Sequence, residues 1–310
     1  MNSQSNAMGG SRLEAQVTAA GEISWAQRMY WSIRRELWEN RSIYVAPLAV
    51  AALVLIGSLI GMFRLPGRMT ALSALSPMQQ QEAIAQPYTY AALAIMFTTF
   101  IVTVFYSLDA LYGERRDRSI LFWKSLPVSD LTTVVSKASI PIVIIPLLTF
   151  AITVVTQWIM VLLSSAALLM NGLSVASLWT TLSLSQSWLM LLYHLVAVHA
   201  LWYAPIYAWL LLVSAWARRV PILWAGLPLL AIALVEKIAF NTTHFAVMLE
   251  HRMDGGIEGA PFTSYGGVSH VMAHHNLAEF VVRPGLWIGL LVAAIFLAGA
   301  VRLRRERGPS

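Results

Sequence analysis

Six long runs of apolar residues restrict the folds that this sequence can adopt. They lie at about 43–63, 89–108, 138–168, 188–213, 220–240 and 286–302. Each approaches or exceeds the roughly 20 residues that a helix needs to cross the hydrocarbon core of a bilayer. Of the 310 residues, 58% are hydrophobic and 12% are charged, whereas soluble domains contain about 25% charged residues. The sequence therefore predicts an all-α integral membrane protein with six transmembrane helices.

The region before the first apolar run divides into two parts. Residues 1–24 are polar and lack the apolar core of a signal peptide, which predicts a disordered cytoplasmic lead-in. Residues 25–40 place Trp25, Met29, Tyr30, Ile33 and Leu37 within an arc of about 140° on a helix, with Arg28, Arg34, Arg35 and Glu39 outside it. This pattern predicts an interfacial amphipathic helix, which could be a simple anchor or a connecting helix that contacts a cytoplasmic partner. Residues 41–310 then form the transmembrane domain.

The distribution of positive charge predicts how the chain is oriented. If the N-terminus is cytoplasmic and all six segments span, 16 of the 21 Lys and Arg residues fall on the cytoplasmic side. Positive residues concentrate in short cytoplasmic loops of membrane proteins. We therefore expect both termini in the cytoplasm and 241–285 on the opposite side. The basic charge is explained by orientation, so no nucleic-acid partner is expected.

The third apolar run is too long for one straight span. It contains Pro141 and Pro146, and proline inside a helix removes a backbone hydrogen bond and bends the helix. We expect a kink in this segment or an extension beyond the bilayer.

A dense charged stretch, LYGERRDRSILFWKSLPVSDL at 111–131, separates the second and third apolar runs. Glu114 and Arg118 are four residues apart, which suits an ion pair on a helix. Leu126 precedes a proline and should end that helix, after which Ser129 or Asp130 can cap the next one. The stretch could be ordinary cytoplasmic charge with interfacial aromatic residues, or a short helix that docks on another protein.

Residues 111–137, LYGERRDRSILFWKSLPVSDLTTVVSK, resemble the corresponding loop in membrane subunits of bacterial type-2 ABC transporters. The resemblance implies a short cytoplasmic coupling helix between spans two and three, seated on a separate ABC ATPase subunit. The residues it assigns to coupling are Glu114, Arg115, Arg116, Asp117, Arg118, Phe122, Trp123 and Lys124. It further implies a permease subunit in the bacterial cytoplasmic membrane, with export as its direction and a second or similar permease as partner. The family often has a re-entrant stretch between spans five and six, for which 241–285 is long enough.

The chain lacks the G-x-x-x-x-G-K-[ST] sequence whose backbone amides cradle nucleotide phosphates. We therefore expect no enzymatic activity and no cofactor in this chain, with ATP and Mg²⁺ bound by the partner ATPase. The chain also has no cysteine, which excludes thiolate metal sites.

Polar residues within the apolar runs are candidates for a translocation path. Gln157 lies in the third run, and His194 and His199 lie in the fourth. Polar groups at membrane depth are costly and tend to face protein or water. They could line a substrate path or form hydrogen bonds between helices.

Histidines between 241 and 285 raise the alternative of an intramembrane metalloenzyme. His270 and His274 are four residues apart, so on a helix they would share a face and could bind zinc. No spacing fixes a third ligand, and we expect no metal site. A non-transporting membrane sensor or assembly partner is the remaining alternative.

Overall fold

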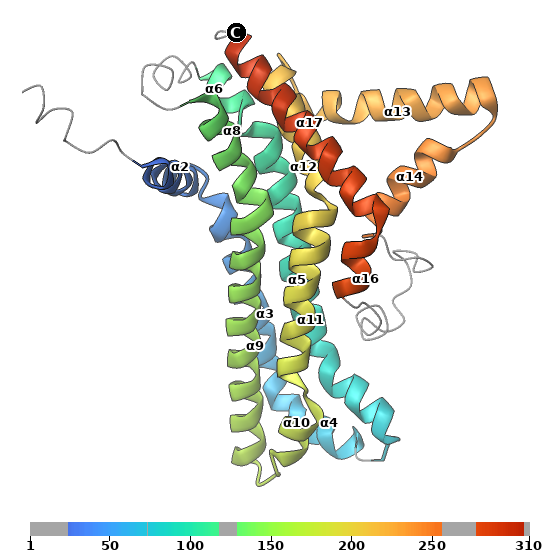
Figure 1. Cartoon of the computed structure of the whole chain (residues 1–310). Coiled ribbons are helices and arrows are strands. Elements are labelled where there is room, and N and C mark those ends of the chain that lie inside the picture. The colour runs from blue at the N-terminus through green and yellow to red at the C-terminus, as the bar shows by residue number, and fades with distance from the viewer. Residues whose placement is uncertain (1–23, 73, 118–128, 256–276, 307–310) are drawn as a thin grey trace, which may run out of the picture.

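The computed structural model describes residues 24–72, 74–117, 129–255 and 277–306, and every regular element within them is helical (Figure 1). The first half contains α2 Trp25–Glu39, α3 Ser42–Gly61, η1 Met62–Arg64, α4 Leu65–Leu72, α5 Pro77–Asp109, α6 Tyr112–Arg116, α8 Asp130–Ser139, η2 Ile140–Ile144 and α9 Ile145–Met170. The second half contains α10 Ala176–Thr181, α11 Leu184–His194, η3 Leu195–Trp202, α12 Ala204–Trp216, α13 Pro221–Phe240, α14 His244–Met253, α16 Leu277–Val282 and α17 Pro284–Glu306.

Six helical segments of the described residues are long and apolar enough to cross a membrane. They are Ser42–Leu72, Pro77–Arg116, Asp130–Met170, Leu178–Trp202, Pro221–Phe240 and Pro284–Glu306. The prediction of an all-α, multi-pass membrane protein is therefore confirmed. The first, second, third and sixth segments extend beyond their apolar runs, because the turns at the ends of these runs continue the same helix.

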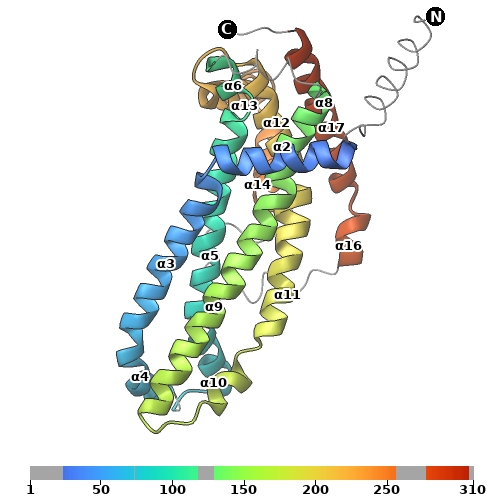
Figure 2. The same ribbon diagram turned by 90° about the vertical axis from the view of Figure 1, so that its left-hand side faces the viewer.

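The long helices α3, α5 and α9 run side by side, and α11 and α12 follow each other along the same bundle (Figures 1 and 2). At one end of the bundle lie α2, α6, α8 and the last turns of α17, and at the other lie α4 and α10. In Figure 2, α2 runs crosswise to the bundle at the level where α3 begins. The loop between spans two and three and the end of the last span therefore meet at one end.

Local sequence signals explain where several helices begin and bend. Ser129 accepts a hydrogen bond from the Thr132 backbone amide at 3.1 Å, which confirms it as the cap of α8. Pro141 and Pro146 flank the point where α8 passes through the π-helical turn η2 into α9, with Ile145 N bonded to Ile140 O. The third span thus contains a π-helical turn at these prolines, which accommodates the missing proline amides.

The fourth apolar run, expected as one helix over 188–213, is divided. α11 leads into the π-helical η3, which ends at Trp202, and α12 begins at Ala204 with Pro205 in its first turn. Proline is suited to the first turn of a helix because the amide it lacks would be unpaired there. The chain therefore restarts as a new helix within the run.

Helix α13 matches 220–240 in length and composition but leaves the bundle. Figure 1 shows it running crosswise from the end that carries α6, and 6% of its apolar window is buried. Val220, just before the helix, has φ 44°, a left-handed conformation that turns the chain away from the direction of α12. This differs from the expectation of a fifth span beside its neighbours, with 241–285 at the opposite end.

Helix α14 returns from α13 towards the middle of the bundle (Figure 1). Arg252 Nη1 donates to the Gly285 carbonyl at 3.0 Å, and its guanidinium lies 4.3 Å from the centre of a Trp202 ring. A Cβ on Gly289 would lie 1.6 Å from Arg252 Nη2, so any other residue at that position would displace the end of the Arg252 side chain. These contacts join α14 to η3 and α17.

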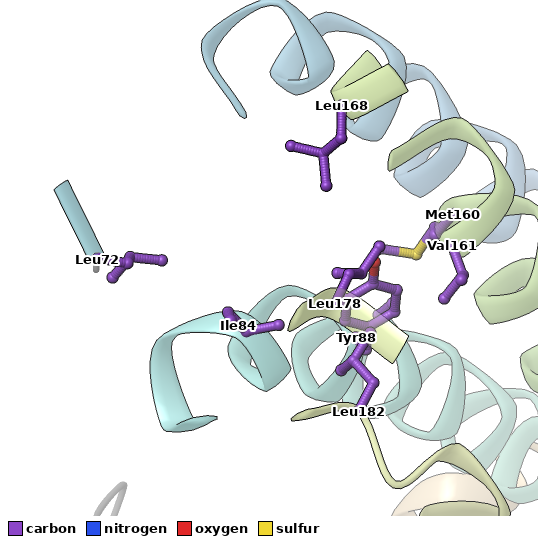
Figure 3. Packing of buried hydrophobic residues seen from close by; sticks show 9 residues of the cluster. Leu72, Ile84, Tyr88, Met160, Val161, Leu168, Leu178 and Leu182 are labelled. Atoms are coloured by element: carbon purple, nitrogen blue, oxygen red, sulfur yellow. The ribbon is translucent and has the colours of Figure 1, made fainter. Parts of the chain in front are cut away.

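The end of the bundle that carries α4 and α10 is packed mainly by apolar side chains. Its cluster contains Leu72, Ile84, Tyr88, Ala91, Met160, Val161, Leu168, Leu178 and Leu182. Figure 3 shows Tyr88 of α5 lying among Met160, Leu178 and Leu182. The helices α4, α5, α9 and α10 therefore meet at this end through dispersion contacts and close packing.

Candidate functional site

The charged stretch begins with the short helix α6, which buries two of its charges. Glu114 and Arg115 are 7% and 5% exposed, whereas Arg116 and Asp117 are exposed. Arg118, Phe122, Trp123 and Lys124 lie outside the described residues. The prediction that all of these residues contribute to coupling stays a prediction. The structure adds that Glu114 and Arg115 are buried and contact other helices of the bundle.

Glu114 is surrounded by three cations from three other helices. Its Oε1 atom lies 2.9 Å from Arg35 Nη2 of α2 and 3.1 Å from Lys137 Nζ of α8. Its Oε2 atom accepts a hydrogen bond from Arg304 Nη1 of α17. A single carboxylate therefore joins α6 to α2, α8 and α17.

A second carboxylate, Glu36 of α2, lies beside the first. Its Oε1 atom accepts a hydrogen bond from Lys137 Nζ at 2.7 Å, and its Oε2 atom accepts one from the Tyr106 hydroxyl of α5 at 3.0 Å. Arg304 Nε also donates to Asp130 Oδ1 at 3.0 Å. We call Arg35, Glu36, Glu114, Asp130, Lys137 and Arg304 the ion cluster.

The ion cluster contains three carboxylates and three cations, so its formal charge balances. Glu36 and Lys137 are each 2% exposed. Removing charges from water costs several kcal/mol per ion, and the pairs offset this cost only in good geometry. The cluster is therefore specific in position, because moving one helix away would leave a buried charge without its partner.

Arg115 holds the end of a fifth helix. Its Nη2 atom donates to the carbonyls of Ser214 and Ala217 at 2.6 and 2.7 Å. The Ser214 hydroxyl in turn accepts hydrogen bonds from the amides of Leu111 and Tyr112, both at 2.9 Å. A cation at the C-terminal carbonyls satisfies acceptors that the helix leaves open and favours its dipole. The first turn of the charged stretch is thereby attached to the end of α12.

Sequence reasoning did not find the ion cluster, although one signal for it is present. At 100° per residue, Glu36 falls within the arc of about 140° that carries Ile33 and Leu37. A carboxylate within the apolar face of an amphipathic helix indicates a buried partner. Ile33 and Leu37 do pack on the bundle, whereas Trp25 and Tyr30, expected on the same face, are exposed.

Gln157, a candidate for the translocation path, is fully engaged between helices. Its Nε2 atom donates to the Tyr88 carbonyl of α5 at 3.0 Å, and its Oε1 atom accepts from Trp188 Nε1 of α11 at 2.7 Å. These bonds match the alternative of hydrogen bonding between helices.

The two histidines of the fourth run have different surroundings. His199 is buried, with Nε2 3.3 Å from the Tyr207 hydroxyl and its ring against Phe100 and Tyr203. His194 is the last residue of α11 and is partly buried. Both histidines therefore lie against protein, and the hydrogen bonds of Gln157 go to Tyr88 and Trp188, whereas that of His199 goes to Tyr207.

The described residues contain no group of three or more His, Cys, Asp or Glu side chains placed to hold a metal ion. His270 and His274, on which the metalloenzyme alternative rests, lie outside those residues.

Protein-family models, curated proteins and solved structures give no match to this chain. Within the described residues, the fold and the ion cluster define a multi-pass helical membrane protein in which α2, α5, α6, α8, α12 and α17 are bonded together at one end.

Proposed function

We propose that this chain is the transmembrane permease subunit of an ABC transporter, an exporter driven by a separate ATPase that docks on 111–131. The observation that supports this most is the attachment of α6. Glu114 and Arg115 bond it to α2, α8, α12 and α17. A partner bound to the loop that follows α6 would therefore be connected through α6 to all of these helices.

Buried ion pairs suit such a connection because they are directional. A displacement of α6 would separate Glu114 from its cations unless α2, α8 and α17 moved with it. The helices would therefore move as a unit, and α12 would follow through Arg115. Access to a path between two permease subunits could be altered in this way by ATP-driven closure of the ATPases.

The remaining residues of the stretch would make the contact with the ATPase. Phe122 and Trp123 would supply most of the docking energy, because buried aromatic anchors dominate protein interfaces. The exposed charges Arg116 and Asp117, with Arg118 and Lys124, would steer the encounter, an effect that weakens with salt. ATP and Mg²⁺ would stay in the ATPase.

The proposal places the end of the bundle that carries α2, α6 and the end of α17 in the cytoplasm of a bacterium. The charge distribution supports this orientation. Because the chain has no cysteine, single cysteines at Arg219 and Met78, which are exposed near opposite ends, can be labelled from either side. Labelling of Met78→Cys from the cytoplasm would contradict the orientation.

The experiment that tests the function is co-purification of an ATPase with the full chain, followed by measurement of ATP hydrolysis in reconstituted membranes. Trp123→Ala should weaken association by about 2 kcal/mol or more while insertion and expression stay normal. Trp179→Ala serves as a matched control, since this tryptophan lies on α10 at the other end of the bundle. If Trp123→Ala and a joint reversal of Arg116 and Arg118 to Glu both leave association and stimulation unchanged, the proposal fails.

A further inference from the structure

Helix α2 presents an alternating row of tryptophan and arginine on the side facing away from the bundle. The row consists of Arg28, Trp31, Arg34 and Trp38, at spacings of three or four residues, and all four side chains are exposed. Residues three and four apart are neighbours on a helix. We call these four residues the outer face of α2.

The outer face is cationic and aromatic at once. The Arg34 guanidinium lies 5.2 Å from the ring centres of both Trp31 and Trp38. Within the part of the chain that the structure describes, no carboxylate pairs with Arg28, Arg34 or Arg41. The nearby Glu39 is paired with Arg35 at 3.3 Å, on the side of the ion cluster. The outer face therefore carries positive charge that its own helix does not neutralise.

The position of α2 indicates what this face meets. The helix lies crosswise to the bundle (Figure 2) and ends three residues before α3, whose apolar residues begin the first candidate span. That level corresponds to the boundary between hydrocarbon and water. Tryptophan is enriched at this boundary, and arginines near it are attracted to anionic lipids. A face that combines the two is complementary to a layer of phosphate groups above acyl chains.

We propose that the outer face of α2 binds the headgroup phosphates of anionic lipids, and that this binding biases the ion cluster held on the opposite side of the same helix. Arg35 and Glu36 directly follow Arg34 in the sequence; Arg35 contacts Glu114, and Glu36 contacts Lys137. A roll or shift of α2 on the lipid surface would change those contacts. The proposed lipid binding is independent of the transport function, whereas the effect on coupling rests on that proposed function.

The test of binding uses the full chain without any ATPase. Purified protein is placed in nanodiscs of phosphatidylcholine alone or mixed with phosphatidylglycerol, and hydrogen exchange of the α2 amides is followed. Phosphatidylglycerol should slow exchange in the wild type. The double variant Arg28→Gln and Arg34→Gln should lose this protection, and its affinity for phosphatidylglycerol, measured by titration, should fall about 25-fold, since each arginine near a surface contributes about fivefold.

A control variant with the same change in net charge is Arg302→Gln with Arg305→Gln, both exposed near the end of α17. It should keep the protection of α2. The binding proposal is overturned if the α2 double variant is protected and binds as the wild type does. It is also overturned if α2 becomes protected only when the ATPase is added, and equally in both lipids, because the face then contacts a protein.

The effect on coupling is tested by ATPase stimulation in the same two lipid mixtures. Stimulation should depend on phosphatidylglycerol in the wild type and in the α17 control, but not in the α2 double variant. If lipid binding is lost in that variant while stimulation responds to lipid as before, the coupling half is overturned. If no ATPase associates at all, the transport function fails while the hydrogen-exchange result still decides the lipid site.

Discussion

At the end of the bundle that carries α6, buried charges join helices from distant parts of the chain, whereas the end that carries α10 is packed mainly by apolar side chains. In the first, Glu114 joins residues 79 and 190 positions away. In the second, Tyr88, Val161 and Leu178 are in contact within one apolar cluster (Figure 3). The comparison shows two ways of holding helices together inside one molecule.

The two kinds of contact respond differently to movement. Apolar side chains in a bilayer gain little from leaving lipid, so their helices associate through close packing and can repack when they slide. A buried charge loses its partner within an ångström or two of displacement and then bears the cost of desolvation. The α6 end should therefore move as one body, and relative motion of helices should be concentrated towards the α10 end.

The largest effect is expected from removing the central carboxylate of the ion cluster. Glu114→Ala leaves three cations without their shared partner and should lower the free energy of unfolding by about 3–5 kcal/mol. Denaturant titration of the purified protein in mixed micelles measures this. Arg116→Ala, two residues away on the same helix but exposed, is the control and should behave as the wild type. A similar, small loss in both variants would contradict the distinction between the two ends.

Hydropathy and local sequence signals predict part of this structure. The presence of six segments long and apolar enough to span follows from run length, the cap of α8 from Ser129, and the irregular turn in the third span from Pro141 and Pro146. These signals lie within a few residues of the feature that they predict. They depend on backbone hydrogen bonding and on the thickness of the bilayer. Both act on a single segment without contacts from the rest of the chain, so the local sequence is sufficient to predict them.

The ion cluster and the path of α13 could not be predicted in the same way. Arg304 and Glu114 meet across 190 positions, and no periodicity relates them. Nothing in the sequence distinguishes Arg115 from the other arginines of the charged stretch. Its contact with the end of α12 depends on how the two helices pack. The direction of α13 depends on one left-handed residue, Val220, a β-branched type that rarely adopts that conformation.

The second largest effect concerns the apolar end. Leu168 of α9 is fully buried in the apolar cluster, and Leu168→Ala should cost about 2 kcal/mol, at the low end of the range for such truncations, because lipid can partly replace lost contacts. Leu169 is the next residue and is 63% exposed, so Leu169→Ala should cause no measurable loss. Unlike changes in the ion cluster, Leu168→Ala should leave ATPase coupling intact. Loss of coupling without loss of stability would contradict this assignment.

The smallest effect is expected beside the apolar cluster, where Gln157 connects α9 to α5 and α11. Gln157→Leu removes the bonds to the Tyr88 carbonyl and to Trp188 Nε1. Hydrogen bonds between helices in membranes average about 0.6 kcal/mol and reach about 1.7, so a loss of about 1 kcal/mol is expected for the pair.

A double-mutant cycle separates this bond from packing. Trp188→Phe removes the indole donor but keeps an aromatic ring, and the losses from Gln157→Leu and Trp188→Phe should add to more than the loss in the double variant, because both singles break the same bond. Additive losses would show that the two residues do not bond. If Gln157→Leu also abolished transport while stability and helix packing stayed close to the wild type, Gln157 would have to face the substrate path. A small loss of stability with transport retained would instead show that Gln157 has a structural role, in which its hydrogen bonds keep α5, α9 and α11 aligned.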